Sequence, residues 1–377
     1  MKNDLLISQK FQIILLALLW AGVQVFVYLQ FGVTEQIDTA AYIADARDIV
    51  EGNVPEQRNF WYAGYSLLLA IILFFNGSPV DIVWLQILFS GITAIAIYRF
   101  VKSLSGSNAT SFIATFLFIA WIKIHQWNTI VYTDALFTYM AVVSLAALHF
   151  SRKSWHYLGV ALLVVFTFFI RPTGIGFLAA MAGYMLFVMK DKIKLQAFPL
   201  ILIGVGVSIA FLVLLNLVLK DYVPDILNSY EKAEIIYPNI PLWIEKPDGL
   251  VMPDSHYPPI LQLLLFVTYN PIYFIKITLL KGALFLGNVK PYFSIFHNAA
   301  IITFLYPLYF FSFYGIRKMP LSAEKIYIIV FMVFTTLTVS LTSENWDGRF
   351  LIPMLPYVFI TAVLGISYFF KWRIFHS

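Results

Sequence analysis

The sequence contains no cysteine and few charged residues. The absence of cysteine excludes a disulfide framework and a thiolate metal site in this chain of 377 residues. Charged residues make up 12% of the sequence, whereas a soluble globular protein carries roughly 25%. Hydrophobic residues make up 60%, with 36 phenylalanines among them, so too little polar surface remains to cover a water-soluble body. The composition therefore predicts an all-α polytopic membrane protein.

Long apolar runs recur along the chain and predict about ten transmembrane helices. They lie at residues 11–31, 80–101, 110–131, 135–150, 155–170, 174–189, 197–219, 298–316, 324–341 and 350–370. The first run is too long for a signal peptide and ends without a small-residue cleavage site. It indicates a retained helix, and the even number of spans places both ends of the chain in the cytoplasm.

The apolar stretch from Ala63 to Asn76 has about 14 residues, which suits an interfacial helix better than a span. If it lies on the membrane surface, the short-loop lysines and arginines gather on the cytoplasmic side, as the positive-inside rule requires. Among them are Arg99, Lys102, Arg152, Lys153, Arg317 and Lys318. The membrane therefore explains the net charge of +5 better than a nucleic-acid partner does.

The segment from Ile260 to Ser294 is apolar but is interrupted by Asn270-Pro271 and by three lysines. A lysine at the middle of the bilayer costs roughly 2.5–3.5 kcal/mol on insertion scales. We expect one or two helices along the outer membrane surface, with a hairpin that crosses twice as the alternative. The chain then divides into a membrane module at 1–219 with an outer loop at 32–79, an outer region at 220–297, and C-terminal spans at 298–377.

Ionisable residues gather at the outer ends of the expected spans. Asp38 follows the first span, and Asp134 stands at the turn between the third and fourth. Arg171 ends the fifth span, and Arg349 opens the last one. Lys281, in the outer region, adds a fifth such position. This gathering at one depth predicts a single site on the outer side.

The two aspartates are the candidate catalytic residues. Asp38 begins an expected amphipathic helix, where a helix N-cap is its simpler interpretation. Asp134 has the alternative of a first-turn acid that interacts with the helix dipole. Against that alternative, a carboxylate in a tight turn between two spans lies at low dielectric, where it makes a better base.

The candidate substrate-binding residues are mainly cations and tyrosines. Arg171 and Arg349 either extend to the interface or bind a phosphate, for which guanidinium groups are suited. His125 either lines the same cavity or packs at the interface. The full substrate-binding set is Tyr42, Arg58, Tyr62, His125, Arg171, Lys281 and Arg349.

Six motifs follow one another along the chain: DTAAYIADAR, EGNVP with YAGYSLLLAIILFFNG, YRFVKSLSG, YTDALF, RPTG and RFLIPMLP. In this order they resemble the GT-C superfamily of membrane glycosyltransferases, which includes protein O-mannosyltransferases and the aminoarabinose transferase of lipid A. The resemblance implies a seven-span module with two interfacial helices in the first outer loop. It also implies that Asp38 is the first-loop catalytic acid and Asp134 the second-loop acid. The chain differs in having YAGYS instead of Pro-Pro before the short helix, and it has no large C-terminal soluble domain, so the acceptor stays open.

The expected activity is transfer of a sugar from a polyprenyl-phosphate donor to an acceptor hydroxyl, with inversion and with Asp38 as general base. The site would face the extracytoplasmic side of the plasma or inner membrane. Expected partners are the lipid-linked donor, a glycan, lipid or protein acceptor, and membrane lipids, but no nucleic acid. We expect a monomer with no cofactor and no metal site, and leave a divalent cation open.

Two other functions are alternatives. A transporter or flippase for lipid-linked sugars would place ionisable residues near the bilayer midplane, often in inverted repeats, whereas here they gather at one face and no repeat is visible. A surface-polysaccharide ligase or polymerase would favour an arginine-rich outer loop, but the loop at 220–257 is acidic.

Overall fold

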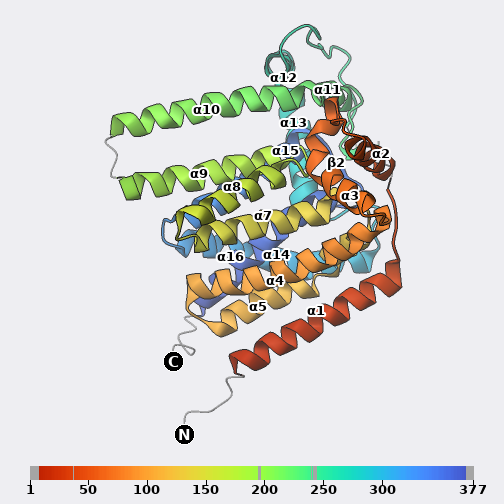
Figure 1. Cartoon of the computed structure of the whole chain (residues 1–377). Helices are drawn as coiled ribbons and strands as arrows, with labels where there is room; N and C mark the ends of the chain where they lie inside the picture. Colours follow the sequence, from red (N-terminus) through yellow and green to blue (C-terminus); the bar gives the residue numbers. More distant parts are fainter. Residues whose placement is uncertain (1–7, 37, 194–196, 239, 241–243, 371–377) are drawn as a thin grey trace. The chain divides into compact units, whose positions relative to one another are not determined.

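The computed structural model describes residues 8–36, 38–193, 197–238, 240 and 244–370. Nearly all of its regular structure is α-helix (Figure 1). The chain forms two compact units. The first comprises Met1–Arg171, Phe304–Pro320 and Ile352–Ser377, and the second comprises Pro172–Thr303 and Leu321–Leu351.

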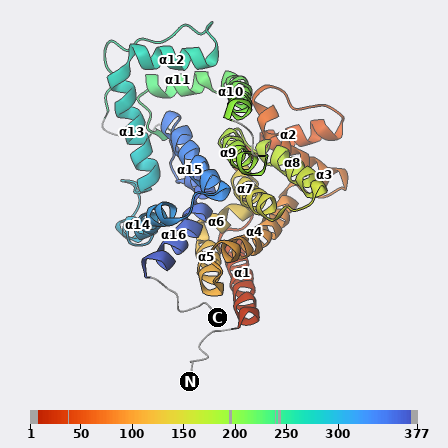
Figure 2. The same ribbon diagram turned by 90° about the vertical axis from the view of Figure 1, so that its left-hand side faces the viewer.

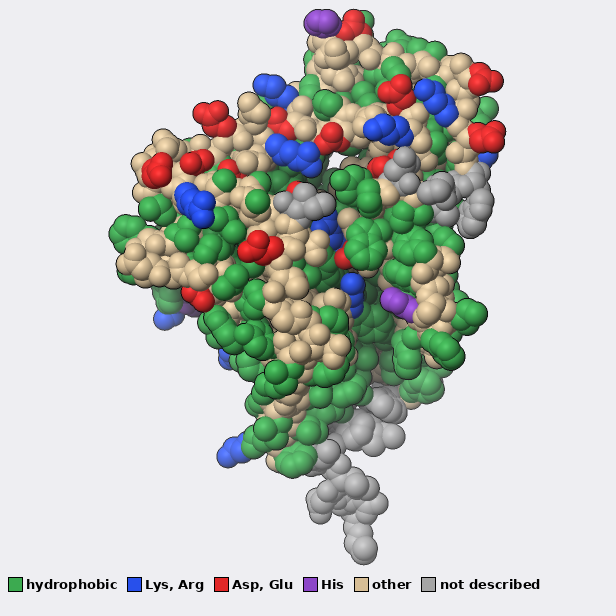
Figure 3. Space-filling model, turned by 90° about the vertical axis from the view of Figure 1, so that its right-hand side faces the viewer, with side chains coloured by type: hydrophobic (Ala, Val, Ile, Leu, Met, Phe, Trp, Pro, Cys, Tyr) green, Lys and Arg blue, Asp and Glu red, His purple; other side chains and the backbone are tan. Residues whose placement is uncertain are grey.

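The all-α, polytopic membrane character predicted from the sequence is confirmed. In the described part of the chain, seven helices are long and apolar enough to cross a membrane, and the number rises to nine if two bent helix pairs each form one span. The seven are Gln9–Phe31, Pro79–Ser105, Thr133–Phe150, Ile201–Lys220, Ile295–Lys318, Ala323–Leu341 and Arg349–Phe369. Hydrophobic side chains cover much of the face drawn in Figure 3, as expected for a surface in contact with lipid. The count of ten stays a prediction.

The first unit contains most of the N-terminal helices. They are α1 (Gln9–Phe31), α4 (Ile82–Ser105), α5 (Asn108–Ala120), α7 (Thr133–Phe150), α8 (Ser154–Phe168) and α16 (Leu355–Phe369), with the end of α14 (Ile295–Lys318). Helix α4 packs against α5 and α7, and α1 packs against α5 (Figure 1). Helices α7 and α16 are buried almost all round, which agrees with their lack of a polar face.

Three short elements follow α1 in the first unit: α2 (Thr39–Val50), η1 (Gln57–Tyr62) and α3 (Ala63–Phe74). Helix α3 has 12 residues, about 18 Å at 1.5 Å per residue, too short to cross a bilayer. The short helix expected from Ala63 is therefore confirmed, and its place at the membrane surface stays a prediction. Gly64 lets α3 approach the end of α8, where its backbone N–H donates to the Phe169 carbonyl oxygen at 2.8 Å.

The expected span over 110–131 is not one straight helix. Helix α5 ends at Ala120, and the chain turns by 52° into α6 (Ile122–Gln126) and η3 (Trp127–Thr129). Residues 116–122, which span the bend itself, are apolar and include no proline or glycine, so the sequence does not mark its position. As a result, residues 130–132 form an irregular segment between η3 and α7.

The second unit contains the rest of the helices and a small strand pair. They are α9 (Gly174–Ile193), α10 (Ala197–Lys220), α11 (Val223–Glu231), β1 (Ile236–Tyr237), α12 (Pro259–Tyr269), α13 (Pro271–Gly287), α15 (Ala323–Leu341) and β2 (Glu344–Asn345), with the 3-10 helix η4 (Arg349–Met354) at its boundary. Helix α9 packs closely against α15 because glycines face it. A Cβ on Gly176 would lie 3.0 Å from the Cβ of Phe334, the type of contact that small residues allow between membrane helices.

The second unit contains a helix corner at Asn270, which the sequence predicted, and a strand pair, which it did not. The segment from Ile260 forms two helices, α12 and α13, bent by 108° at Asn270 (Figure 2). The Asn270 amide holds this corner by hydrogen bonds in both directions with the backbone of Val251, at 2.7 and 3.0 Å. Strands β1 and β2 pair in parallel, with Ile236 opposite Glu344. Whether α12 and α13 lie along the membrane or cross it stays open.

Candidate active site

Backbone hydrogen bonds bring the loop that carries Asp38 against the segment before α7. The backbone N–H of Thr34 donates to the carbonyl oxygen of Thr129 at 2.9 Å, and the N–H of Val131 donates to the carbonyl oxygen of Thr34 at 3.1 Å. The hydroxyl of Thr39 donates to the carbonyl oxygen of Val131 at 2.8 Å. These bonds place Asp38, at the start of α2, beside Tyr132.

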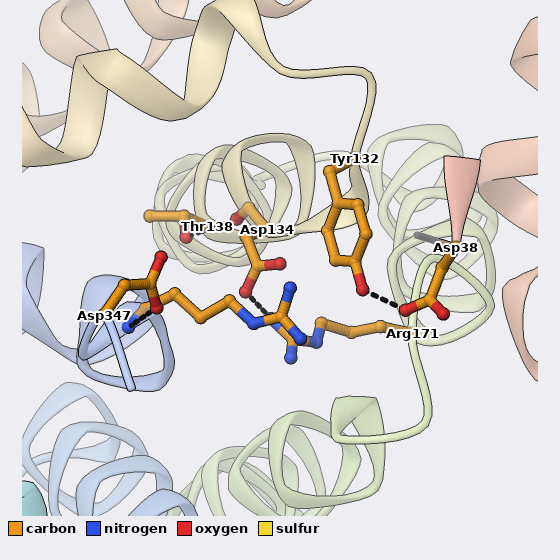
Figure 4. Close-up of polar contacts among 7 residues, drawn as sticks. Asp38, Tyr132, Asp134, Thr138, Arg171 and Asp347 are labelled. Atoms are coloured by element: carbon orange, nitrogen blue, oxygen red, sulfur yellow. Dashed lines mark hydrogen bonds and ion pairs between the residues drawn. The ribbon is translucent and has the colours of Figure 1, made fainter. Parts of the chain in front are cut away.

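Asp38 occupies the N-cap position of α2, but among the described residues its carboxylate makes no capping hydrogen bond. The hydroxyl of Tyr132 donates to Asp38 Oδ2 instead (Figure 4). The neighbouring Thr39 hydroxyl accepts from the backbone N–H of Gln36 at 2.9 Å. Asp38 itself is exposed, so one carboxylate oxygen is held by Tyr132 while the residue stays open to solvent or substrate.

Asp134 lies in the first turn of α7 and is fully buried. Its Oδ1 accepts from Arg171 Nη1, which follows the end of α8 (Figure 4). Its Oδ2 has no hydrogen-bond partner among the residues that the structure describes. The sequence predicted both residues at the site, but it did not predict that Arg171 would pair with Asp134.

Four tyrosines, Tyr42, Tyr62, Tyr65 and Tyr132, form a cluster between the two aspartates. The Tyr42 ring lies 5.2 Å from that of Tyr62, 5.3 Å from that of Tyr65 and 5.6 Å from that of Tyr132. We call these four residues the tyrosine cluster.

Electrostatics places both carboxylates next to this cluster. Burial raises the pKa of Tyr42 well above its ordinary value of 10.0, and Tyr62, Tyr132, Asp38 and Asp134 add to the rise in that order. Burial likewise raises the pKa of Tyr65, followed by the charge of Asp134. Figure 4 shows the same grouping, with Tyr132 between Asp134 and Asp38 and its hydroxyl bonded to Asp38. The structure therefore brings Asp38 and Asp134 to one site within the first unit.

A buried amide network supports the segment before α7. Gln24 Oε1 accepts from Asn128 Nδ2 at 2.7 Å, and Asn128 Oδ1 accepts from the Tyr139 hydroxyl at 2.6 Å. Gln86 Nε2 donates to the carbonyl oxygens of Asn128 and Ile130 at 2.9 and 3.0 Å. Because hydrogen bonds fix residues 128 and 130 from several sides, the segment before α7 holds Tyr132 in a defined position.

His125 belongs to this network. Its Nε2 lies 3.1 Å from the Phe118 carbonyl oxygen and its Nδ1 lies 3.1 Å from Gln24 Nε2. A carbonyl only accepts and an amide nitrogen only donates, so Nε2 carries the proton. Both ring nitrogens are therefore occupied, and the structure gives His125 a supporting position under the segment before α7.

The other candidates fall in different places. Tyr62 is half-buried in the tyrosine cluster, and Arg58 is exposed on η1. Lys281 and Arg349 belong to the second unit. Lys281 is fully buried, donates to Ser229 Oγ at 3.2 Å and to the Thr342 carbonyl oxygen, and lies 4.2 Å from the Tyr230 ring centroid.

Arg349 is half-buried, and its backbone N–H donates to Asp347 Oδ1 at 3.1 Å. The structure thus brings together Asp38, Asp134, Arg171, Tyr42 and Tyr62 within the first unit, whereas Lys281 and Arg349 belong to the second unit.

Sequence reasoning missed Tyr65 and Tyr132. Tyr132 stands two positions before Asp134, so its closeness to that residue was visible. Its bond to Asp38 was not, because it depends on two loops that meet only in the folded chain.

No family model matches the chain, and no curated protein matches it. Within the described residues, no group of three or more His, Cys, Asp and Glu side chains is arranged to hold a metal ion.

Proposed function

We propose that this multi-pass membrane protein is a glycosyltransferase that moves a sugar from a polyprenyl-phosphate donor to an acceptor hydroxyl at the extracytoplasmic face. One observation carries the proposal. Asp38 and Asp134, far apart in the sequence, share one tyrosine cluster, and one of them is exposed while the other is buried and paired. This arrangement suits a reaction that needs an accessible base, which Asp38 can be, and a charge in a fixed position, which Asp134 supplies.

The proposed step is a single displacement. The acceptor oxygen attacks the anomeric carbon and forms the new glycosidic bond, while the bond from that carbon to the phosphate oxygen breaks. The acceptor proton passes to Asp38, and polyprenyl phosphate leaves with the bonding electron pair. One displacement inverts the anomeric configuration, and a positioned general base contributes roughly 10²–10⁴-fold to such a rate.

Asp134 and Arg171 have a different role in this proposal. Their ion pair holds the start of α7, and with it the turn that carries Tyr132, against the end of α8. The Oδ2 of Asp134, which has no hydrogen-bond partner in the part of the chain that the structure describes, supplies an acceptor for a hydroxyl of the substrate. Tyrosines combine an apolar ring with a polar end, which suits Tyr42 and Tyr62 to a sugar. Phosphate contacts by Arg171, Arg349 and Lys281 stay a prediction.

The test uses the purified full-length chain in proteoliposomes with membrane extract as a source of acceptors. The donors are a panel of polyprenyl-phosphate sugars that carry ³H in the sugar and ³²P in the phosphate. Released ³²P-labelled polyprenyl phosphate and ³H-labelled glycan product are measured together. We expect Asp38→Asn to lower the rate roughly 10²–10⁴-fold. The control is Asp48→Asn, an exposed acid on the same helix, which should keep the wild-type rate.

Two results would contradict the proposal. Wild-type rates with Asp38→Asn would exclude Asp38 as the base. Movement of donor lipid between leaflets without any sugar transfer would favour the flippase alternative.

A further inference from the structure

We propose that Tyr132 is a positioning residue for this reaction, with its hydroxyl holding Asp38 Oδ2 so that Oδ1 is directed to the acceptor. The inference rests on the proposed function and adds a residue to it. It starts from an unusual feature of Asp38. An aspartate at a helix N-cap normally accepts from the first turn of its own helix, but here the Tyr132 hydroxyl is the donor instead.

An exposed aspartate without a partner rotates among its rotamers. A general base must instead be held within hydrogen-bond reach of the proton that it accepts, and a displacement of 1 Å can cost 10²-fold in rate. A hydrogen bond from a fixed donor therefore increases the fraction of time that Asp38 spends in the productive orientation.

Tyr132 meets the requirement of a fixed donor. Only 5% of it is exposed. Its ring packs edge-on against Tyr42 at 5.6 Å and against Trp127 at 5.9 Å between centroids. Its backbone is extended, at φ −155° and ψ 160°, immediately before α7. These contacts hold the ring from two sides while its hydroxyl donates to Asp38 Oδ2.

The distance between the two residues is set by the backbone and not by their own hydrogen bond. The bonds of Thr34 and Thr39 to residues 129–131 already join the two loops. Removal of the Tyr132 hydroxyl should therefore leave ring packing and loop pairing in place and free only the carboxylate. This separation makes the proposal testable with Tyr132→Phe.

The experiment measures transfer kinetics and thermal unfolding of the full-length chain in proteoliposomes. We expect Tyr132→Phe to lower kcat roughly 10–100-fold with an unchanged KM for the donor lipid. The matched control is Tyr98→Phe, which removes another buried tyrosine hydroxyl, the donor to Gln12 Oε1 at 3.3 Å. It should keep kcat per folded molecule, since this hydroxyl contacts neither Asp38 nor the amide network before α7.

Two further variants separate positioning from a general effect on folding. In an Asp38→Asn background, Tyr132→Phe should cause no additional loss, because residues that act as one unit are not additive. Asp38→Glu, at an exposed position where folding is not at risk, moves the carboxylate away from Tyr132 and should also lower kcat.

A wild-type kcat for Tyr132→Phe, or an equal loss with and without Asp38, would overturn the role of Tyr132 while leaving the transferase intact. A wild-type kcat for Asp38→Glu would overturn it as well, because the orientation of the carboxylate would then not matter. Absence of transfer by the wild-type chain would instead overturn the proposed function, and this inference with it.

Discussion

Asp134 and Arg171 form an ion pair in which both side chains are buried, with 0% and 8% of their surface exposed. The two residues come from the start of α7 and from the turn after α8. A buried charge costs several kcal/mol to remove from water, and a partner recovers that cost only while it is present. A substitution of either residue alone should therefore destabilise the chain more than a substitution of an exposed acid.

We predict that Arg171→Met destabilises the first unit by about 3–5 kcal/mol, because it leaves the Asp134 carboxylate buried without its partner. The double variant Arg171→Met with Asp134→Leu should recover most of this loss, since no charge stays unpaired. Thermal unfolding in detergent measures both. If the double variant is as unstable as the single one, the contact between the start of α7 and the turn after α8 depends on side-chain packing and not on charge. Arg152→Met, at an exposed position, is the control.

The sequence predicted the helices well because long apolar runs leave little choice in a bilayer. The start of α3 at Ala63, the break at Asn270 and the length of α10 all follow from hydropathy and from proline or glycine positions. The position of the bend after Ala120 does not follow from the sequence, since residues 116–122 are apolar and no proline or glycine marks the break.

The candidate site was predictable only in part. Topology alone suggested that Asp38 and Asp134 share one side of the membrane, and the structure brings them to one tyrosine cluster. The partners of each carboxylate were not predictable. Tyr132 reaches Asp38 and Arg171 reaches Asp134 across loops, and side-chain directions in irregular segments are not encoded in a periodic pattern. For the same reason, the sequence left open whether His125 lines the cavity or packs at the interface.

Gly64 gives a prediction about the contact between α3 and α8. A Cβ at this position would lie 2.9 Å from both the carbonyl oxygen of Phe166 and the carbonyl carbon of Phe169. These are backbone atoms that do not rotate away, so Gly64→Ala should cost about 1–3 kcal/mol. Gly22→Ala in α1 has no atom within 4 Å of the added Cβ and should be neutral or slightly stabilising. Equal unfolding temperatures for the two variants would show that α3 can shift freely.

The amide network predicts a second stability effect. Asn128→Leu removes the donor to Gln24 and the acceptor of the Tyr139 hydroxyl, and leaves both partners buried. Such unsatisfied groups cost about 1–3 kcal/mol each. Hydrogen exchange of residues 127–132 should therefore become faster than in the wild type, while Asn53→Leu, at an exposed loop position, should leave it unchanged. Unaltered protection in Asn128→Leu would mean that the backbone bonds of Thr34 are sufficient by themselves.

Glu344 on β2 predicts how the stability of the second unit depends on pH. Its side chain is fully buried, Oε1 accepts from the backbone N–H of Asn345 at 2.8 Å, and Oε2 has no partner among the described residues. Burial raises its pKa from 4.5 to about 7, although the positive charge of Lys290 opposes the rise. The folded chain thus keeps a proton that the unfolded chain releases above about pH 4.5.

The contribution of protonated Glu344 to stability is therefore fully present below pH 4.5 and is lost as the pH rises through about 7. We expect the unfolding temperature of the wild-type chain to fall between about pH 5 and 8, and to fall less in Glu344→Gln, which stays neutral throughout. The control Glu245→Gln replaces an exposed acid of the same unit and should keep the wild-type slope. Hydrogen exchange of the β1–β2 pair, followed over the same range, locates the effect. If the Glu344→Gln slope equals that of the wild type, another group in the chain is responsible for the pH dependence.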